Sequence, residues 1–139
     1  MATTVDLRAV DVIRSEIERF ADVARRRSDS DPAQHRRSRR RYQRSWPLLV
    51  THGRVELSAA LHNGSDEGIA FLSHSPVTPD TVVFIRLFCY DESATYVPAI
   101  VRHSTNTEHG YLIGCEFALT DEALCREAIM KSPQTVAVC

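Results

Sequence analysis

The sequence predicts a mainly β domain, a six-stranded antiparallel barrel or sandwich with one helix before it and one after it. Three observations support this prediction. Short runs rich in β-branched and aromatic residues recur between residues 46 and 118, turn-forming residues separate the runs, and a helical pattern lies on each side of them. The length of 139 residues suits one domain with a short appendage, and a hydrophobic content of 43% is typical of a folded protein.

An amphipathic helix is expected over residues 4–27. Thr3, with Asp6 three residues later, can cap its start. Its apolar residues recur at spacings of three and four, so they share one stripe. We expect the stripe to pack against the protein's own domain, and a short coiled-coil seam between two chains is the alternative. The stripe consists of Val10, Ile13, Ile17, Phe20 and Ala24.

Six strands are expected after this helix, and groups of glycine, proline, asparagine, aspartate and serine predict the turns between them. A closing helix is expected over 120–131, with Thr120 as its cap and with Leu124, Ala128 and Ile129 facing the strands. The expected strands cover residues 46–51, 54–61, 68–73, 81–89, 95–103 and 110–118.

Charge is distributed unevenly along the chain, although the formal net charge is only −1. Residues 1–44 contain twelve arginines against seven carboxylates, whereas residues 45–139 contain five basic residues against eleven carboxylates. Six of the arginines lie between Arg36 and Arg44. One interpretation is a basic arm that grips a nucleic acid, but the acidic remainder of the chain would repel such a polyanion.

Two groups of polar residues are not explained by the predicted scaffold. Arg40 and Arg44 lie four residues apart directly before the first expected strand, and Asn63, Ser65 and Gly68 lie between the second and third. One pair of expected strands lies between the two groups, leading away from the first group and back to the second. We therefore expect the groups to meet at one end of the barrel. Asparagine and serine offer fixed donors and acceptors, and a glycine permits either a positive φ or the close approach of a ligand.

These motifs, with GYLIGCEF as a late strand, resemble the PilZ domain family over residues 36–130. That family binds the bacterial second messenger cyclic di-GMP through an R-x-x-x-R motif and a [D/N]-x-S-x-x-G motif. The resemblance implies a PilZ-like β-barrel receptor, with Asn63 at a position where aspartate is commoner. The ligand-binding residues that it implies are Arg39, Arg40, Arg44, Asn63, Ser65 and Gly68.

The chemistry of arginine suits this ligand, which has two phosphates and two guanines. A guanidinium can donate two hydrogen bonds to guanine O6 and N7, fork onto a phosphate, or stack on a purine. Trp46 is expected in the core, with contact to the ligand as the alternative. Asp66 and Glu67 are expected to be solvated turn residues, because carboxylates would oppose the binding of a diphosphate.

No catalytic or metal-binding motif is evident. The four cysteines form no C-x-x-C pair, Cys89 and Cys115 are expected in the core, and the six histidines lack metal-ligand spacing. No apolar run approaches the length of a membrane span, and the N-terminus carries no apolar signal segment. We therefore expect a cytoplasmic protein that is not an enzyme and needs no cofactor or metal.

The expected function is a bacterial cyclic di-GMP receptor that regulates a protein partner when its arginine arm and N-terminal helix change arrangement. A homodimer through that helix is a further expectation. The alternatives are a nucleic-acid-binding barrel with a basic arm, and a PilZ-like adaptor that binds no nucleotide. The expected division is a helix at 1–27, a linker and ligand-binding arm at 28–44, the barrel with its closing helix at 45–133, and a tail at 134–139.

Overall fold

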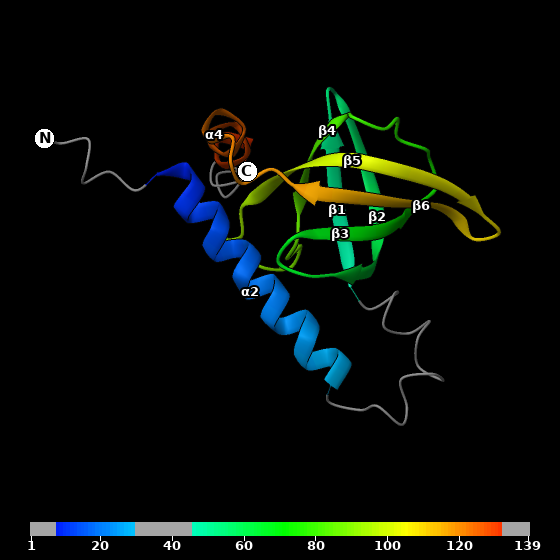
Figure 1. The fold of residues 1–139 in the computed structure, drawn as a ribbon, viewed down its shortest axis with the longest axis horizontal. Helices are drawn as coiled ribbons and strands as arrows, with labels where there is room; N and C mark the ends of the chain where they lie inside the picture. The colour runs from blue at the N-terminus through cyan, green and yellow to red at the C-terminus, as the bar shows by residue number, and fades with distance from the viewer. Residues whose placement is uncertain (1–7, 30–45, 132–139) are drawn as a thin grey trace, which may run out of the picture.

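A computed structural model describes residues 8–29 and 46–131, in which six antiparallel strands close into a barrel (Figure 1). The order of the strands around the barrel is β1–β2–β3–β6–β5–β4. The predicted fold is therefore confirmed, and the barrel rather than the sandwich is the correct alternative. The elements are α2 (Ala9–Asp29), β1 (Pro47–His52), β2 (Val55–Gly64), β3 (Gly68–Ser73), β4 (Val82–Arg86), β5 (Tyr96–Thr107), β6 (Gly110–Phe117) and α4 (Glu122–Lys131).

Alternating side chains fill the interior of the barrel, as the period of a β-strand requires. On β3, for example, Ile69 and Phe71 point inward and are buried. On β6, Ile113 and Cys115 do the same, so the residues between them face outward. This alternation fixes which motif residues lie on the outer surface.

Two strands run further than the sequence indicates. β2 continues past residue 61 to Gly64, and β5 continues past residue 103 to Thr107. In each case the register shifts by one residue, between Leu61 and Asn63 on β2 and between Val101 and His103 on β5. A β-bulge lets the pairing continue after an extra residue, so a polar pair within a strand need not end it.

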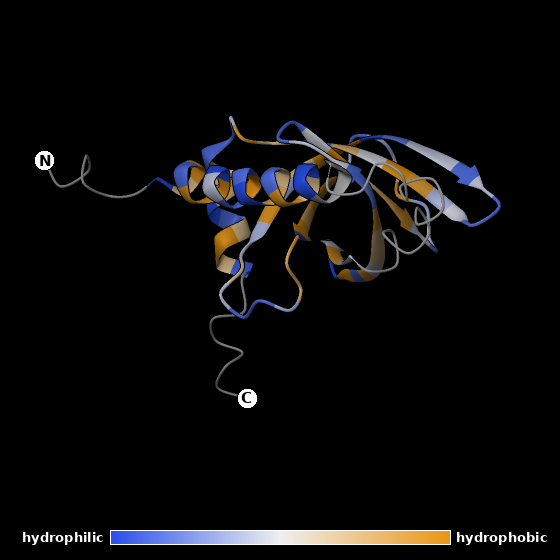
Figure 2. Ribbon diagram, turned by 90° about the horizontal axis from the view of Figure 1, so that it is seen from below, coloured by the Kyte–Doolittle hydropathy of each residue, from blue (hydrophilic) through white to orange (hydrophobic). Residues whose placement is uncertain are grey.

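Helix α2 packs along the barrel through its apolar stripe and also contacts α4 (Figures 1 and 2). Ile13, Ile17 and Phe20 are at most 1% exposed. The prediction that this stripe packs against the protein's own domain is thus confirmed. A second copy of the chain would have to contact another face of α2.

The ends of the helices differ from the predicted ones in a way that joins α2 to α4. The main-chain N–H groups of Ala9 and Val10 donate to the Glu122 carboxylate, at 3.2 and 3.3 Å. The predicted cap at Thr3 and Asp6 lies outside the described residues. A carboxylate at this position suits the positive end of the helix dipole.

The predicted cap of α4 was wrong by one residue. Asp121 directly precedes the helix, and its Oδ1 accepts the N–H of Leu124 at 3.1 Å. Thr120 lies one residue too early for this contact, because a capping oxygen reaches the second or third N–H of a helix. Cys125 and Ala128 form the buried face of α4, whereas the predicted Leu124 and Ile129 are only partly buried.

Candidate ligand-binding groove

A groove of about 840 Å³ lies on the outer face of the barrel, across β2, β3, β6 and β5. Its floor contains Gly68, Ala70 and Gly114, whose side chains are absent or small. The whole predicted Asn63–Gly68 motif lines one side of it. A shallow floor of this kind leaves room for a flat ring to lie against the sheet.

The motif residues after β2 form a tight turn. The N–H of Ser65 donates to the Gly68 carbonyl at 2.9 Å, and the N–H of Glu67 donates to Ser65 Oγ at 3.1 Å. The Glu67 carbonyl in turn accepts the N–H of Phe117 at 3.0 Å, which ties the turn to β6. Ser65 therefore stabilises this turn as an acceptor, and its hydroxyl group can still donate a hydrogen bond to a ligand.

The structure gives a reason for Gly68 that the sequence analysis did not state, and it excludes the positive φ that was one of the two expected reasons. A Cβ atom at this position would lie 2.3 Å from the main-chain oxygen of Cys115, and Gly68 does not have a positive φ. The residue is thus required for the close pairing of β3 with β6. Any closer approach of a ligand is a consequence of that pairing.

Replacing Gly68 with alanine is expected to lower the free energy of unfolding by about 2–3 kcal/mol, because the added methyl group collides with main chain that cannot turn aside. Ser65→Ala is the matched comparison in the same turn. It removes one hydrogen bond, adds no atom, and should cost only about 1 kcal/mol. Urea denaturation measures both, and a Gly68→Ala variant as stable as the wild type would contradict the steric argument.

Asn63 lies at the end of the groove where the chain enters the barrel. Its side chain is exposed, and its strand neighbour is Ala70. The Trp46 carbonyl accepts the N–H of Leu61 at 3.0 Å, so the chain two residues after the arginine block lies beside the motif strand. Arg39, Arg40 and Arg44 themselves lie outside the described residues, and their predicted roles stay predictions.

The wall of the groove opposite Asn63 was missed by the sequence analysis. It is formed by Arg102 and His103, which the bulge in β5 turns outward together. Two nitrogens of the Arg102 guanidinium contact one oxygen of Glu116: Nε donates to Oε1 at 2.9 Å, and Nη2 lies 2.8 Å from the same atom. The sequence feature that could have indicated this wall is Gly114, a glycine at an outward position within the expected strand GYLIGCEF.

The described part of the groove carries more negative than positive charge. Asp66, Glu67 and Glu116 are exposed carboxylates, and Arg102 is the positive residue of the described lining. The prediction that Asp66 and Glu67 are solvated is confirmed. An anionic ligand in this groove would therefore need additional cations, and the arginine block adjoins it in the sequence.

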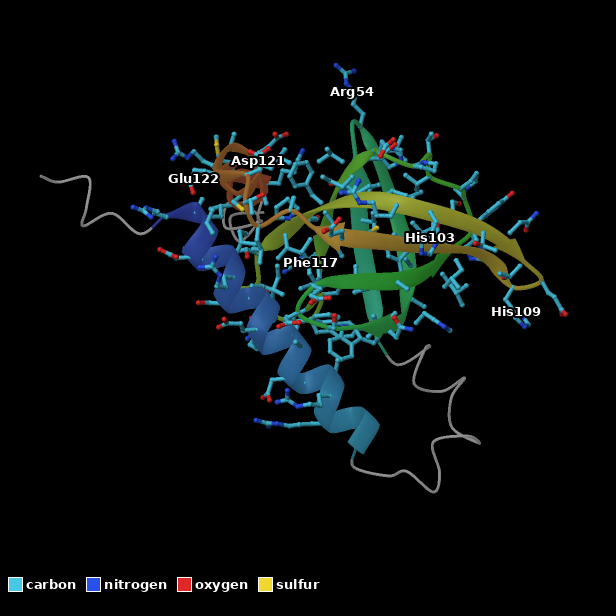
Figure 3. All side chains as sticks on the ribbon, in the orientation of Figure 1. Arg54, His103, His109, Phe117, Asp121 and Glu122 are labelled. Carbon is cyan, nitrogen blue, oxygen red and sulfur yellow. The ribbon has the colours of Figure 1, made fainter. Side chains whose placement is uncertain are left out.

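Trp46 belongs to the core, as predicted. It is 7% exposed, and its Nε1 donates to the Leu87 carbonyl at 2.8 Å. Its ring makes an edge contact with Phe20 of α2, with centroids 5.3 Å apart. Phe20 also contacts Phe117 at the end of β6, which Figure 3 labels, with centroids 6.2 Å apart.

The cysteines of the described residues are free thiols. Burial raises the pKa of the Cys115 thiol to about 12, so this residue beneath the groove stays protonated and unreactive at neutral pH. Its predicted place in the core is confirmed, whereas Cys89 is only half-buried. Within residues 8–29 and 46–131, no group of three His, Cys, Asp or Glu residues is arranged to hold a metal ion.

Neither described helix combines the length and the apolar character that crossing a membrane demands. A family model described as PilZ domain matches residues 34–130, a span that includes the arginine block, the barrel and nearly all of α4. A comparison with curated proteins gave no match.

Proposed function

Because the chain belongs to the PilZ domain family of cyclic di-GMP receptors and adaptors, we propose that it binds cyclic di-GMP and regulates a protein partner. The observation that carries this proposal is the groove beside the Asn63–Gly68 motif, at the end of the barrel where the chain arrives from the arginine block. The proposal includes no catalytic step and no cofactor. The site of action is the bacterial cytoplasm.

In the proposed complex, Arg40 and Arg44 bind the phosphates and a guanine, with Arg39 beside them. Asn63 and Ser65 donate to the ligand from the barrel, and Gly68 keeps the floor low. The excess of carboxylates in the described groove supports the assignment of phosphate binding to the arm, since the barrel alone would repel a ligand with two phosphates. The same excess disfavours a long nucleic acid, which would extend past the arm.

Isothermal titration calorimetry with cyclic di-GMP, cyclic di-AMP, GTP and a short single-stranded DNA tests the proposal. We expect cyclic di-GMP to bind most tightly, because each of its two guanines offers two acceptors, O6 and N7, to an arginine. Adenine has the N7 acceptor but an amino group in place of O6. Binding of the DNA without cyclic di-GMP would favour the nucleic-acid alternative. Binding of none of the four would favour the adaptor that acts through protein contacts alone.

The contact between Phe20 and the motif supports a link from the ligand to α2. A Cβ atom on Gly64, inside the motif, would lie 2.4 Å from the ring of Phe20. The same ring contacts Trp46, the described residue nearest the arm. We propose that a change in the arrangement of the arm on ligand binding shifts α2 through Phe20, which alters a surface that a protein partner recognises.

This shift keeps α2 on the barrel. Each fully buried apolar side chain of the stripe contributes about 1.5–3 kcal/mol, so undocking Ile13, Ile17 and Phe20 together would cost more than a ligand's difference in affinity ordinarily supplies. Arg19 adds an ion pair with Asp91, at 3.0 Å. A homodimer, if formed, would accordingly use the outer face of α2.

Trp46 is the only tryptophan of the chain and can report the proposed shift. We expect its fluorescence emission to change when cyclic di-GMP binds, since its ring contacts Phe20 and Trp46 lies two residues after Arg44. Hydrogen exchange of the α2 amides should change in parallel. If calorimetry detects binding while both signals stay constant, the receptor proposal survives and the shift of α2 is wrong.

A further inference from the structure

We propose that His103 contacts the bound ligand. We further propose that Gly114, which has no side chain, leaves the space that the His103 imidazole needs for this contact. This inference rests on the proposed function, because it names a binding residue of the same groove. It adds a second wall to a site whose implied residues all lie in the arm or in the Asn63–Gly68 motif. Figure 3 labels His103 beside β5 and β6, well away from His109 near the tip of their hairpin.

The register of the sheet connects His103 to the motif. Asn63 pairs with Ala70, Ala70 with Gly114, and Gly114 with His103, so the four residues form one row across β2, β3, β6 and β5. Three strand spacings separate the two ends of this row, which is about 14 Å. The polar ends therefore flank a middle that has only a methyl group and a hydrogen as side chains.

The imidazole of His103 occupies the space above Gly114. A Cβ atom there would lie 2.2 Å from Nε2 and 2.3 Å from Cε1 of the ring. The ring thus lies over the main chain of β6 at Gly114, in the lining of the groove, where it remains exposed to solvent and to a ligand. It can exist in this position because residue 114 has no side chain.

Neighbouring groups leave His103 available to a ligand. Arg102 is engaged by Glu116, and Asp80 lies 3.6 Å from its guanidinium. Among the described residues, by contrast, the His103 ring has no hydrogen-bond partner. An imidazole offers a donor, an acceptor and an aromatic face, and a purine base can use the edge or the face. A guanine held at Asn63 and lying on Ala70 would meet this ring.

Calorimetry with cyclic di-GMP on four proteins tests the inference: the wild type, His103→Ala, Gly114→Ala and the double variant. We expect each single change to weaken binding about tenfold, the effect of losing one base contact. The double variant should bind no more weakly than His103→Ala alone, because Gly114 acts only through the ring. His109→Ala, outside the groove lining, should bind as the wild type does.

Stability separates a binding role from a structural one. The three atoms nearest to a Cβ at position 114 belong to the His103 side chain, which can swing outward, so the melting temperatures should agree within a few degrees. Wild-type affinity in His103→Ala would overturn the inference. Equal losses from Gly114→Ala with and without His103 would overturn the role of Gly114. Absence of binding by the wild type would instead refute the proposed function itself.

Discussion

Replacing Phe20 with alanine is expected to lower the free energy of unfolding by about 3–5 kcal/mol, the usual cost of emptying a buried aromatic site. The ring is 0% exposed and fills the space between α2, Trp46, Gly64 and Phe117. The added edge contacts with Trp46 and Phe117 place the effect toward the upper part of this range. Urea denaturation followed by circular dichroism measures the change.

Glu18→Ala provides the matched control for Phe20→Ala. Glu18 lies on the exposed face of the same helix, and its truncation should change the free energy of unfolding by no more than about 0.5 kcal/mol. A loss of under 1 kcal/mol for Phe20→Ala would mean that α2 contributes little to the stability of the barrel. That result would also remove the physical basis for the proposed link between the ligand and α2.

Replacing both Arg40 and Arg44 with alanine is expected to weaken the binding of cyclic di-GMP at least about 100-fold. A hydrogen bond to a charged group contributes about 1.5–3 kcal/mol, and the described groove offers few cations to replace the two that are lost. Calorimetry measures the loss directly. The change in Trp46 fluorescence on addition of ligand should disappear with it.

The control is the pair Arg37→Ala and Arg41→Ala, which removes the same charge at the same spacing from the same block. We expect it to weaken binding only about two- to threefold, through the weaker local field. Salt separates the two effects further, because long-range attraction is screened and direct contacts are screened less. Equal losses from both pairs would show that the Arg40–Arg44 frame is not the specific one.

The strands were predictable because each carries its own pattern. In GIAFLS, for example, Ile69 and Phe71 point into the core, and their alternation identifies the inward face of the strand. Their neighbour β2 was predicted too short, because His62 and Asn63 resemble the start of a turn. The continued pairing with Ala70 depends on β3, which local sequence does not contain.

The candidate site was predictable only along the chain. Asn63, Ser65 and Gly68 form a motif within six residues, and the structure brings them together along one side of the groove. His103 and Gly114 are eleven residues apart on different strands, and neither belongs to a local motif. Their proximity follows from the register of β5 with β6, including the bulge after Val101.

The amino-acid sequence by itself determined the class of this protein: the alternation of its strands, the amphipathic stripe of α2 and the two polar motifs are all local patterns. The tertiary structure alone decided which surfaces those patterns share. It placed Phe20 against Gly64, Gly68 against Cys115, and His103 over Gly114. Each of these contacts joins residues from different elements, and closure of the barrel fixes their spacing through main-chain pairing that side-chain patterns do not encode.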